Sequence, residues 1–288
     1  MSKTLYFDNH ATTPVDPRVV EAVQPYWHEE FGNAGSISHQ LGKQAAKAVG
    51  VARQQVASAV GVSASEVLFT SGATESINLA IQGACFANDS NRKQLITVAT
   101  EHKAVLDTCE AMERLGYQTQ VLPVLPDGRV NLDALDEALQ TPTLLVAVMA
   151  VNNETGVTQD IESIATKVRG AGALLFVDGA QAPGRMRLRL HDSMVDLCSL
   201  TAHKCYGPKG IGALIVGERA QIAPIMFGGG QERGLRPGTC PVASVVALGQ
   251  ALEIAESERD TDSARIAALS ASVWHRLRAE VQAIELNG

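Results

Sequence analysis

The sequence lacks the cysteine and histidine patterns of disulfide-rich and metal-binding proteins. Its five cysteines are scattered among 288 residues and include no CxxC pair, so neither a disulfide framework nor a cysteine-based zinc site is predicted. The seven histidines include no HxxxH pair, the spacing at which two histidines on one helix face bind zinc. We therefore expect no metal site.

Long apolar stretches and clusters of positive charge are also missing. The longest apolar run, Leu144 to Val151, is too short to span a membrane, and the start MSKTLYFDNH lacks the apolar core of a secretory signal. We therefore expect a cytoplasmic protein without membrane contact. The net charge of −7, a pI near 5.5 and the absence of a Lys/Arg-rich run argue against direct nucleic-acid binding and favour a small substrate.

The hydrophobic pattern predicts an α/β fold. The chain is long enough for about two domains, and 45% of its residues are hydrophobic. Short apolar runs alternate with amphipathic stretches, which indicates a mostly parallel sheet flanked by helices. The expected strands are 67–69, 94–99, 118–124, 143–151, 173–177, 195–200 and 211–216. After an extended start over 1–14, the expected helices are one from Pro17 towards Trp27, then 39–60, 77–86, 103–115, 132–139, 160–170, 241–257 and 263–284.

Two of the expected strands end at residues suited to covalent cofactor chemistry. Asp178 ends the apolar run 173–177, and Lys204 follows the run 195–200. Open α/β sheets bind ligands at the carboxyl ends of their strands. A lysine that forms a Schiff base and a carboxylate that pairs with a pyridinium nitrogen are typical of enzymes that use pyridoxal 5'-phosphate (PLP). The same residues also suit a turn-forming aspartate and a solvated loop lysine.

The segment 70–76, TSGATES, joins a strand directly to a helix. Free N–H groups at a helix start bind phosphate, and the hydroxyls of Ser71 and Thr74 would add donors. No GxxxxGK[ST] motif occurs, so this is not a Walker A loop. The alternative is an ordinary helix cap.

Polar residues follow further strands. If the sheet is parallel, five side chains meet at one edge of it. These are Thr74, His102, Asn153, Asp178 and Lys204. The alternative for His102 is again a helix cap.

The last third of the chain contains a glycine-rich loop and an amphipathic helix. Segment 228–239, GGGQERGLRPGT, indicates either a loop that approaches a ligand or a second subunit, or a flexible linker. Helix 263–284 has an apolar stripe that would need a partner layer. The stripe consists of Ile266, Leu269, Val273, Leu277, Val281 and Ile284.

Seven blocks of the sequence resemble those of one enzyme family, in the same order. They are YFDNHATTPVDPRV, FTSGATESINLAI, TEHKAVLDTC, VNNETGVTQDI, VDGAQAPG, AHKCYGPKGIGAL and GGGQERGLRPGT. Over essentially its whole length the chain resembles the cysteine desulfurases of the NifS/IscS type, in the class V aminotransferase branch of fold-type I PLP enzymes. The resemblance implies a large PLP-binding domain at 15–258 and an incomplete small α+β domain formed by 1–14 and 259–288.

The resemblance also implies a role for each strand-end residue. Lys204 would form a Schiff base with PLP, Asp178 would pair with the pyridinium nitrogen, and His102 would stack on the ring and assist proton transfer. Gln181 and Asn153 would reach the phenolic oxygen. The phosphate would be held by Ala73, Thr74, Thr201 and His203, and by Thr239 from the other subunit of a homodimer.

The reaction implied by the resemblance converts L-cysteine to L-alanine and transfers the sulfur as a cysteine persulfide. The block TEHKAVLDT is closer to the group that serves iron–sulfur scaffold proteins and tRNA thiolation than to the SufS-like group. Two alternatives stay open. One is a selenocysteine lyase or another class V enzyme, and the other is a catalytically silent PLP-fold subunit that binds a partner.

The sequence departs from the family in two places. Thr201-Ala202 stands where many relatives have Ser-Gly, which keeps a hydroxyl group. The part that carries the nucleophilic cysteine and the substrate-binding arginine in relatives has no counterpart here. We expect either a fragment of a full-length desulfurase, which we favour, or a shortened paralogue that cannot complete persulfide chemistry alone. Cys205 and Cys240 adjoin family blocks but are interpreted as structural thiols. We therefore expect the chain alone to be poorly soluble or to expose its apolar stripe, and to release no sulfide from cysteine.

Overall fold

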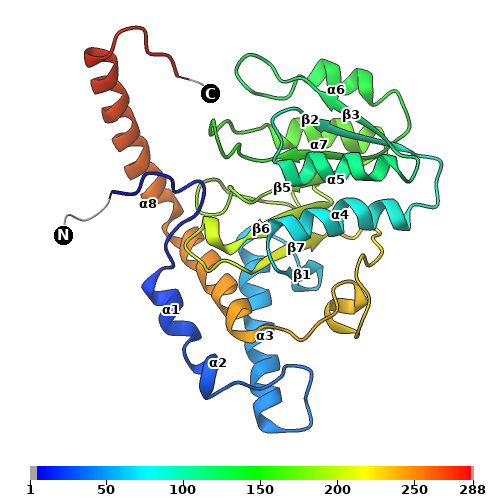
Figure 1. The fold of residues 1–288 in the computed structure, drawn as a ribbon, viewed down its shortest axis with the longest axis vertical. Helices are drawn as coiled ribbons and strands as arrows, with labels where there is room; N and C mark the ends of the chain where they lie inside the picture. Colours follow the sequence, from blue (N-terminus) through cyan, green and yellow to red (C-terminus); the bar gives the residue numbers. More distant parts are fainter. Residues whose placement is uncertain (1–4, 287–288) are drawn as a thin grey trace.

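The structure, a computed structural model, describes residues 5–286. Seven strands form one sheet in the order β1-β7-β6-β5-β4-β2-β3 (Figure 1). The strands are β1 (Val67–Thr70), β2 (Gln94–Val98), β3 (Gln118–Leu122), β4 (Thr143–Met149), β5 (Leu174–Asp178), β6 (Leu197–Thr201) and β7 (Gly212–Val216). β7 is antiparallel to both of its neighbours, whereas the other adjacent pairs are parallel. The predicted α/β fold with a mostly parallel sheet is confirmed.

Helices cover both faces of the sheet because successive strand residues point to opposite sides. In β1, Val67 and Phe69 belong to the core that contains residues of α1, α3, α6, α7 and α8, while Leu68 belongs to the core that contains residues of α4 and α5. The helices are α1 (Pro17–Val23), α2 (Pro25–His28), α3 (Gln40–Val60), α4 (Ala73–Ala87), α5 (Lys103–Glu113), α6 (Leu132–Ala138), α7 (Ile161–Gly170) and α8 (Val242–Glu280). Short 3-10 turns lie at Ala64–Glu66, Ala202–Lys204 and Gln231–Gly234.

The end of the chain differs from the prediction. Instead of helices at 241–257 and 263–284, the structure has one helix, α8, which ends at Glu280. The stretch between the expected helices, SERDTDS, is polar but contains no glycine or proline to stop a helix. Arg259 pairs with Glu256, and Arg265 pairs with Asp262, which supports the helix across this stretch. The proposed domain boundary at 258 therefore falls inside a continuous helix.

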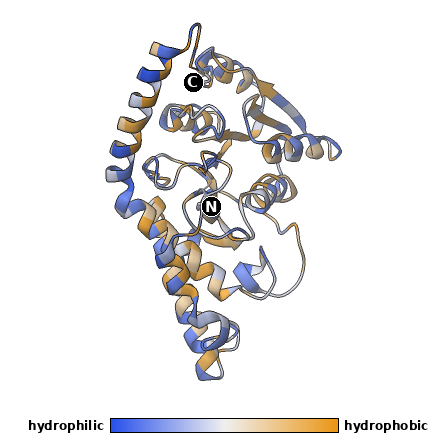
Figure 2. Cartoon of the chain, turned by 60° about the vertical axis from the view of Figure 1, so that its left-hand side comes forward, coloured by the Kyte–Doolittle hydropathy of each residue, from blue (hydrophilic) through white to orange (hydrophobic). Residues whose placement is uncertain are grey.

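The two halves of α8 have different surroundings. Its first half packs on α3 and α1, and Leu248 and Leu252 there are fully buried. Its second half extends away from the rest of the molecule (Figure 2), and Leu269 and Val273 are exposed there. The predicted stripe therefore has no covering layer within residues 5–286.

Other differences are small. The helix predicted from Pro17 towards Trp27 is divided into α1 and α2, and α4 begins at Ala73, directly after the turn that follows β1. Residues 1–4 of the expected small domain lie outside the described residues. Within residues 5–286, no helix combines the length and the apolarity that crossing a membrane requires.

Candidate active site

A pocket of about 410 Å³ lies at the carboxyl edge of the sheet. Four parallel strands, β2, β4, β5 and β6, end at this edge, and β1 runs in the same direction because both β1 and β6 are antiparallel to β7. Nine of the ten predicted site residues line the pocket. They are Ala73, Thr74, His102, Asn153, Asp178, Gln181, Thr201, His203 and Lys204.

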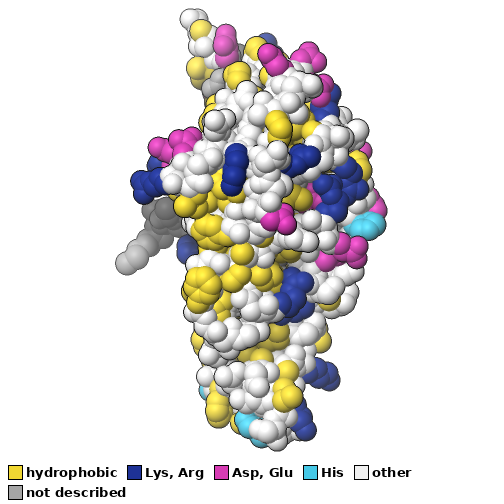
Figure 3. Space-filling view, turned by 90° about the vertical axis from the view of Figure 1, so that its right-hand side faces the viewer, with side chains coloured by type: hydrophobic (Ala, Val, Ile, Leu, Met, Phe, Trp, Pro, Cys, Tyr) yellow, Lys and Arg dark blue, Asp and Glu magenta, His cyan; other side chains and the backbone are white. Residues whose placement is uncertain are grey.

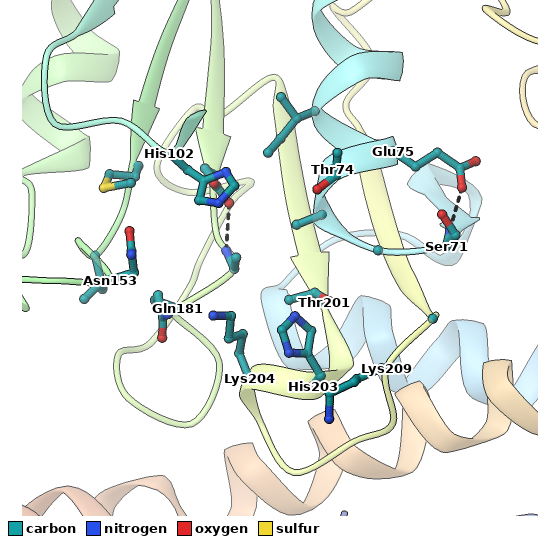
Figure 4. A pocket seen from close by; sticks show the side chains of 18 residues that line it. Ser71, Thr74, Glu75, His102, Asn153, Gln181, Thr201, His203, Lys204 and Lys209 are labelled. Atoms are coloured by element: carbon teal, nitrogen blue, oxygen red, sulfur yellow. Dashed lines mark hydrogen bonds between the residues drawn. The ribbon is translucent and has the colours of Figure 1, made fainter. Parts of the chain in front are cut away.

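Lys204 reaches into the pocket from the turn after β6. Figure 4 shows Lys204 and His102 approaching the same space from opposite sides. The Lys204 Nζ donates hydrogen bonds to the carbonyl oxygens of His10 and Ala11, the latter at 2.9 Å. Burial and the nearby positive charge of Arg185 lower the pKa of the Lys204 amine. The amine therefore loses its proton more readily than a solvated lysine, which favours nucleophilic attack.

Asp178 lies at the floor of the pocket, at the end of β5. Its Oδ1 accepts hydrogen bonds from the Ser199 hydroxyl at 2.7 Å and from the Ala180 N–H at 3.0 Å. Burial raises the pKa of Asp178, while these two hydrogen bonds and the charges of His102 and Lys204 lower it in part. A cation in the pocket would give this buried carboxylate the charge partner that favours its ionised form.

The turn between β1 and α4 approaches β7 very closely. Gly72 stands at the start of α4, and Thr70 and Thr201 both pair with Gly212 of β7. A Cβ atom on Gly212 would lie 2.4 Å from the Leu200 oxygen and 2.7 Å from the Gly72 Cα. Because Gly212 has no side chain, the start of α4 can lie next to the end of β6, where Thr201 is located.

The alternative interpretation as a helix cap is correct for His102, whereas α4 has Gly72 at its N-cap and no side-chain cap hydrogen bond. The His102 Nδ1 accepts a hydrogen bond from the Ala104 N–H at 3.0 Å, so His102 caps α5 while its ring lines the pocket. Glu75 accepts a hydrogen bond from the Ser71 N–H at 2.7 Å, which stabilises the turn before α4. His102 therefore both caps α5 and lines the pocket.

The glycine-rich loop is anchored beside the pocket and is not a free linker. Arg236 forms two hydrogen bonds with Glu75, at 2.7 and 3.2 Å, and Glu232 forms an ion pair with Arg53 at 2.6 Å. Thr239, at the end of this loop, is exposed and does not line the pocket. In this respect Thr239 differs from the other nine predicted residues.

No cysteine lines the pocket within residues 5–286. Burial raises the pKa of Cys205 to about 12 and that of Cys240 to about 11. The Cys205 Sγ contacts the carbonyl oxygens of Thr201 and Ala202. Both thiols therefore have the properties of structural cysteines.

Several neighbours of the site were missed from the sequence. His10 and Ala11 contact Lys204 through backbone oxygens, which no side-chain pattern indicates. Arg185 lies near Lys204 and donates to the Gln181 carbonyl oxygen at 3.1 Å. Ser199 could have been found, because it is a polar residue in the apolar strand LCSLT, opposite Asp178 in the register.

A family model described as aminotransferase class-V matches residues 5–288. The chain belongs to the aminotransferase class-V family. It is 47% identical over 287 residues to a protein named cysteine desulfurase IscS from Methylobacillus flagellatus, covering 99% of this chain and 71% of that relative. A protein of the same name from an Anaeromyxobacter species is 47% identical over 290 residues, covering 100% of this chain and 72% of the relative.

Solved structures of class V relatives have the same fold. A NifS-like protein superposes with a TM-score of 0.93 at 38% identity, covering 96% of this chain and 76% of the other. A structure described as SspA in complex with cysteine has a TM-score of 0.83 at 39% identity, covering 87% of this chain and 72% of that chain. The predicted resemblance to cysteine desulfurases is thereby confirmed.

The pocket fits PLP, the cofactor that the class V family uses. The side chain of Gln181 lines the pocket, and its amide Nε2 is a donor that suits a phenolic oxygen. The start of α4 offers N–H groups to a phosphate, Asp178 offers an anion to a pyridinium nitrogen, and Lys204 offers an amine to an aldehyde. These groups match the functional groups of PLP one by one.

Proposed function

We propose that this chain is a PLP-dependent cysteine desulfurase that acts on L-cysteine and yields L-alanine. The observation that carries the proposal is the convergence of Lys204 and Asp178, from the ends of adjacent strands, on one pocket beside the start of α4. The cysteine bound to the SspA neighbour supports cysteine as the substrate. The names of the relatives support desulfuration over other class V reactions.

In the proposed site, Lys204 would hold the cofactor covalently and Asp178 would keep the ring nitrogen protonated. When bound, PLP would supply an electron sink for negative charge at the substrate α-carbon. His102 would hold the ring, and Asn153 and Gln181 would hold the phenolic oxygen. The phosphate would be held by Ala73, Thr74, Thr201 and His203.

We further propose that the Lys204 amine would act as the base that accepts the proton from the substrate α-carbon. Its lowered pKa suits this task, since a larger fraction of the amine is then unprotonated and able to accept a proton. His102, on the opposite side of the pocket, assists proton transfer.

We further propose a cytoplasmic homodimer in which Thr239 of each subunit reaches the phosphate of the other. Two observations support it: Thr239 is exposed outside its own pocket, and its loop is anchored next to that pocket through Arg236 and Glu75. Figure 3 shows hydrophobic side chains gathered on one face, and the large exposed hydrophobics include Trp27 and Phe227. Exposed apolar surface of this kind favours protein contacts.

The proposed sulfur acceptors are proteins such as an iron–sulfur scaffold, or the machinery of tRNA thiolation. Because no cysteine of residues 5–286 lines the pocket, we propose that a thiol other than the five in this chain takes up the sulfur. The 288-residue chain alone should then bind PLP and L-cysteine without releasing sulfide.

The test is a titration of the PLP-loaded chain with amino acids, followed by its visible absorbance. L-cysteine should change the spectrum, and an external thiol acceptor should be required before alanine and sulfide appear. A response to L-selenocysteine alone would favour a lyase. A protein that binds PLP but responds to neither amino acid would instead be the silent partner-binding subunit, and the proposal would fail.

A further inference from the structure

The segment Asp8–Thr13, here called the strap, lies against the pocket through polar contacts. The His10 carbonyl oxygen accepts hydrogen bonds from the Lys204 Nζ and, at 2.9 Å, from the Gln181 Nε2. The Ala11 carbonyl oxygen accepts a second bond from the Lys204 Nζ at 2.9 Å. Two side chains of the pocket thus hold the strap through its backbone.

The strap is hinged at Thr13. The Thr13 N–H and hydroxyl both donate to the His203 carbonyl oxygen, at 2.9 and 3.1 Å, and the Tyr206 N–H donates to the Thr13 hydroxyl at 2.8 Å. Thr13 is only 3% exposed, whereas His10 and Ala11 are exposed. Thr12 is also fixed at the hinge, because its hydroxyl lies 3.2 Å from the His203 Nδ1. Before Thr12, the strap is held by Lys204 and Gln181 and by one further contact, from the His10 Nδ1 to the Asn153 carbonyl oxygen at 3.2 Å.

Cofactor binding requires the same two donor groups that hold the strap, the Lys204 Nζ and the Gln181 Nε2. A charged lysine amine has three N–H groups, but a nitrogen bonded covalently to a cofactor carbon through a double bond keeps at most one. Lys204 can then no longer donate to both His10 and Ala11. An amide that contacts a phenolate oxygen must donate through its Nε2, the atom that Gln181 now gives to His10.

We propose that the strap and the cofactor compete for Lys204 and Gln181, so that cofactor loading releases residues 8–11 while Thr12 and Thr13 stay bonded to His203. This inference rests on the proposed function, because it requires PLP at Lys204. Coupling between two binding events is reciprocal. Removal of the strap contacts therefore tightens cofactor binding.

Hydrogen–deuterium exchange of the full chain, with and without PLP, tests the release. Peptides that cover residues 5–11 should exchange faster after loading, and peptides that begin after Thr13 should be unchanged. In Lys204→Met, which cannot bind PLP covalently, the exchange of the strap should not respond to added PLP as it does in the wild type. Slower or unchanged exchange at residues 5–11 in a wild-type chain that has bound PLP overturns the inference and leaves the proposed function standing.

The expected effect of the strap on cofactor binding is tested by measuring PLP affinity through absorbance. A variant that lacks residues 2–11 keeps the Thr13 hinge but loses both carbonyl groups, and its affinity for PLP should rise about three- to tenfold, as expected for the loss of one or two competing hydrogen bonds. Thr13→Val, which loosens the hinge, should act in the same direction.

Thr108→Val is the matched control, since Thr108 is equally buried and donates to the Ala104 carbonyl oxygen away from the pocket. It should leave the affinity unchanged. Weaker PLP binding in the strap variants overturns the inference alone. A wild-type chain that binds no PLP overturns both the inference and the proposed function.

Discussion

The pocket and the second half of α8 differ in how their side chains are partnered. At the pocket, Asp178 and Lys204 contact groups from other segments of the chain. On the second half of α8, Leu269, Val273 and Leu277 are 40–57% exposed and face no other layer within residues 5–286. The polar side chains of the pocket thus have partners elsewhere in the chain, whereas the apolar face of the outer helix has none within residues 5–286. Substitutions should therefore affect function strongly at the pocket and stability only weakly on the outer helix.

The largest effect is expected for Lys204→Ala. Without the amine no covalent bond to PLP can form, so the visible absorbance of the bound cofactor should fall to background. Lys209→Ala is the control, because Lys209 also lines the pocket but has no proposed role. An unchanged spectrum in Lys204→Ala would refute the assignment of the cofactor lysine.

Asp178→Asn should lower the rate of cofactor-dependent chemistry by about 10²- to 10³-fold, because the charge that keeps the ring nitrogen protonated is lost. The measurement is the rate of spectral change after L-cysteine is added. Asp196→Asn is a matched control: Asp196 is also buried and accepts a backbone N–H, from Leu175 at 2.8 Å, but it lies outside the pocket. Equal losses in both variants would show a general effect on folding instead.

The two halves of α8 should also differ in how much they contribute to the free energy of unfolding. Leu248→Ala, in the buried half, should lower the free energy of unfolding by about 2–5 kcal/mol through loss of packing. Leu269→Ala, in the exposed half, should change it by no more than about 0.5 kcal/mol. Denaturant unfolding of both variants is the measurement. A large loss in Leu269→Ala would mean that the outer half of α8 is covered in solution.

The smallest effect concerns pH. The pKa of Lys204 is lowered below the ordinary value of 10.5 by burial and by the charge of Arg185. Only the neutral amine bonds to PLP, so loading should increase with pH and reach its midpoint below 10.5. Arg185→Met should raise this midpoint, because it removes a positive charge that disfavours the protonated amine. Arg187→Met, which alters an exposed arginine of the same loop, should not shift it.

The lowered pKa of Lys204 also makes the stability of the folded chain depend on pH. The unfolded chain binds the Lys204 proton more tightly than the folded chain, so this group's contribution to stability rises with pH up to about 10.5. Unfolding experiments on wild type and Lys204→Met across this range would show the difference.

The parts of the fold that depend on local pattern could be predicted from the sequence. Each strand end was marked by a polar residue after an apolar run, which placed Asp178 and Lys204 at one edge of the sheet. The continuity of α8 was missed because a run of charged residues was interpreted as a break, although it contains no helix-stopping residue. The contacts of His10 and Arg185 were missed because they join segments far apart in the chain.

Gly212 sets a limit on how this protein can vary. Since even a methyl group there would push the turn before α4 away from the end of β6, an alanine at 212 would separate the part of the pocket formed by the start of α4 from the part that carries Lys204. Random mutagenesis under selection for cofactor binding should therefore leave glycine at position 212, although glycine has no side chain that could contact a ligand.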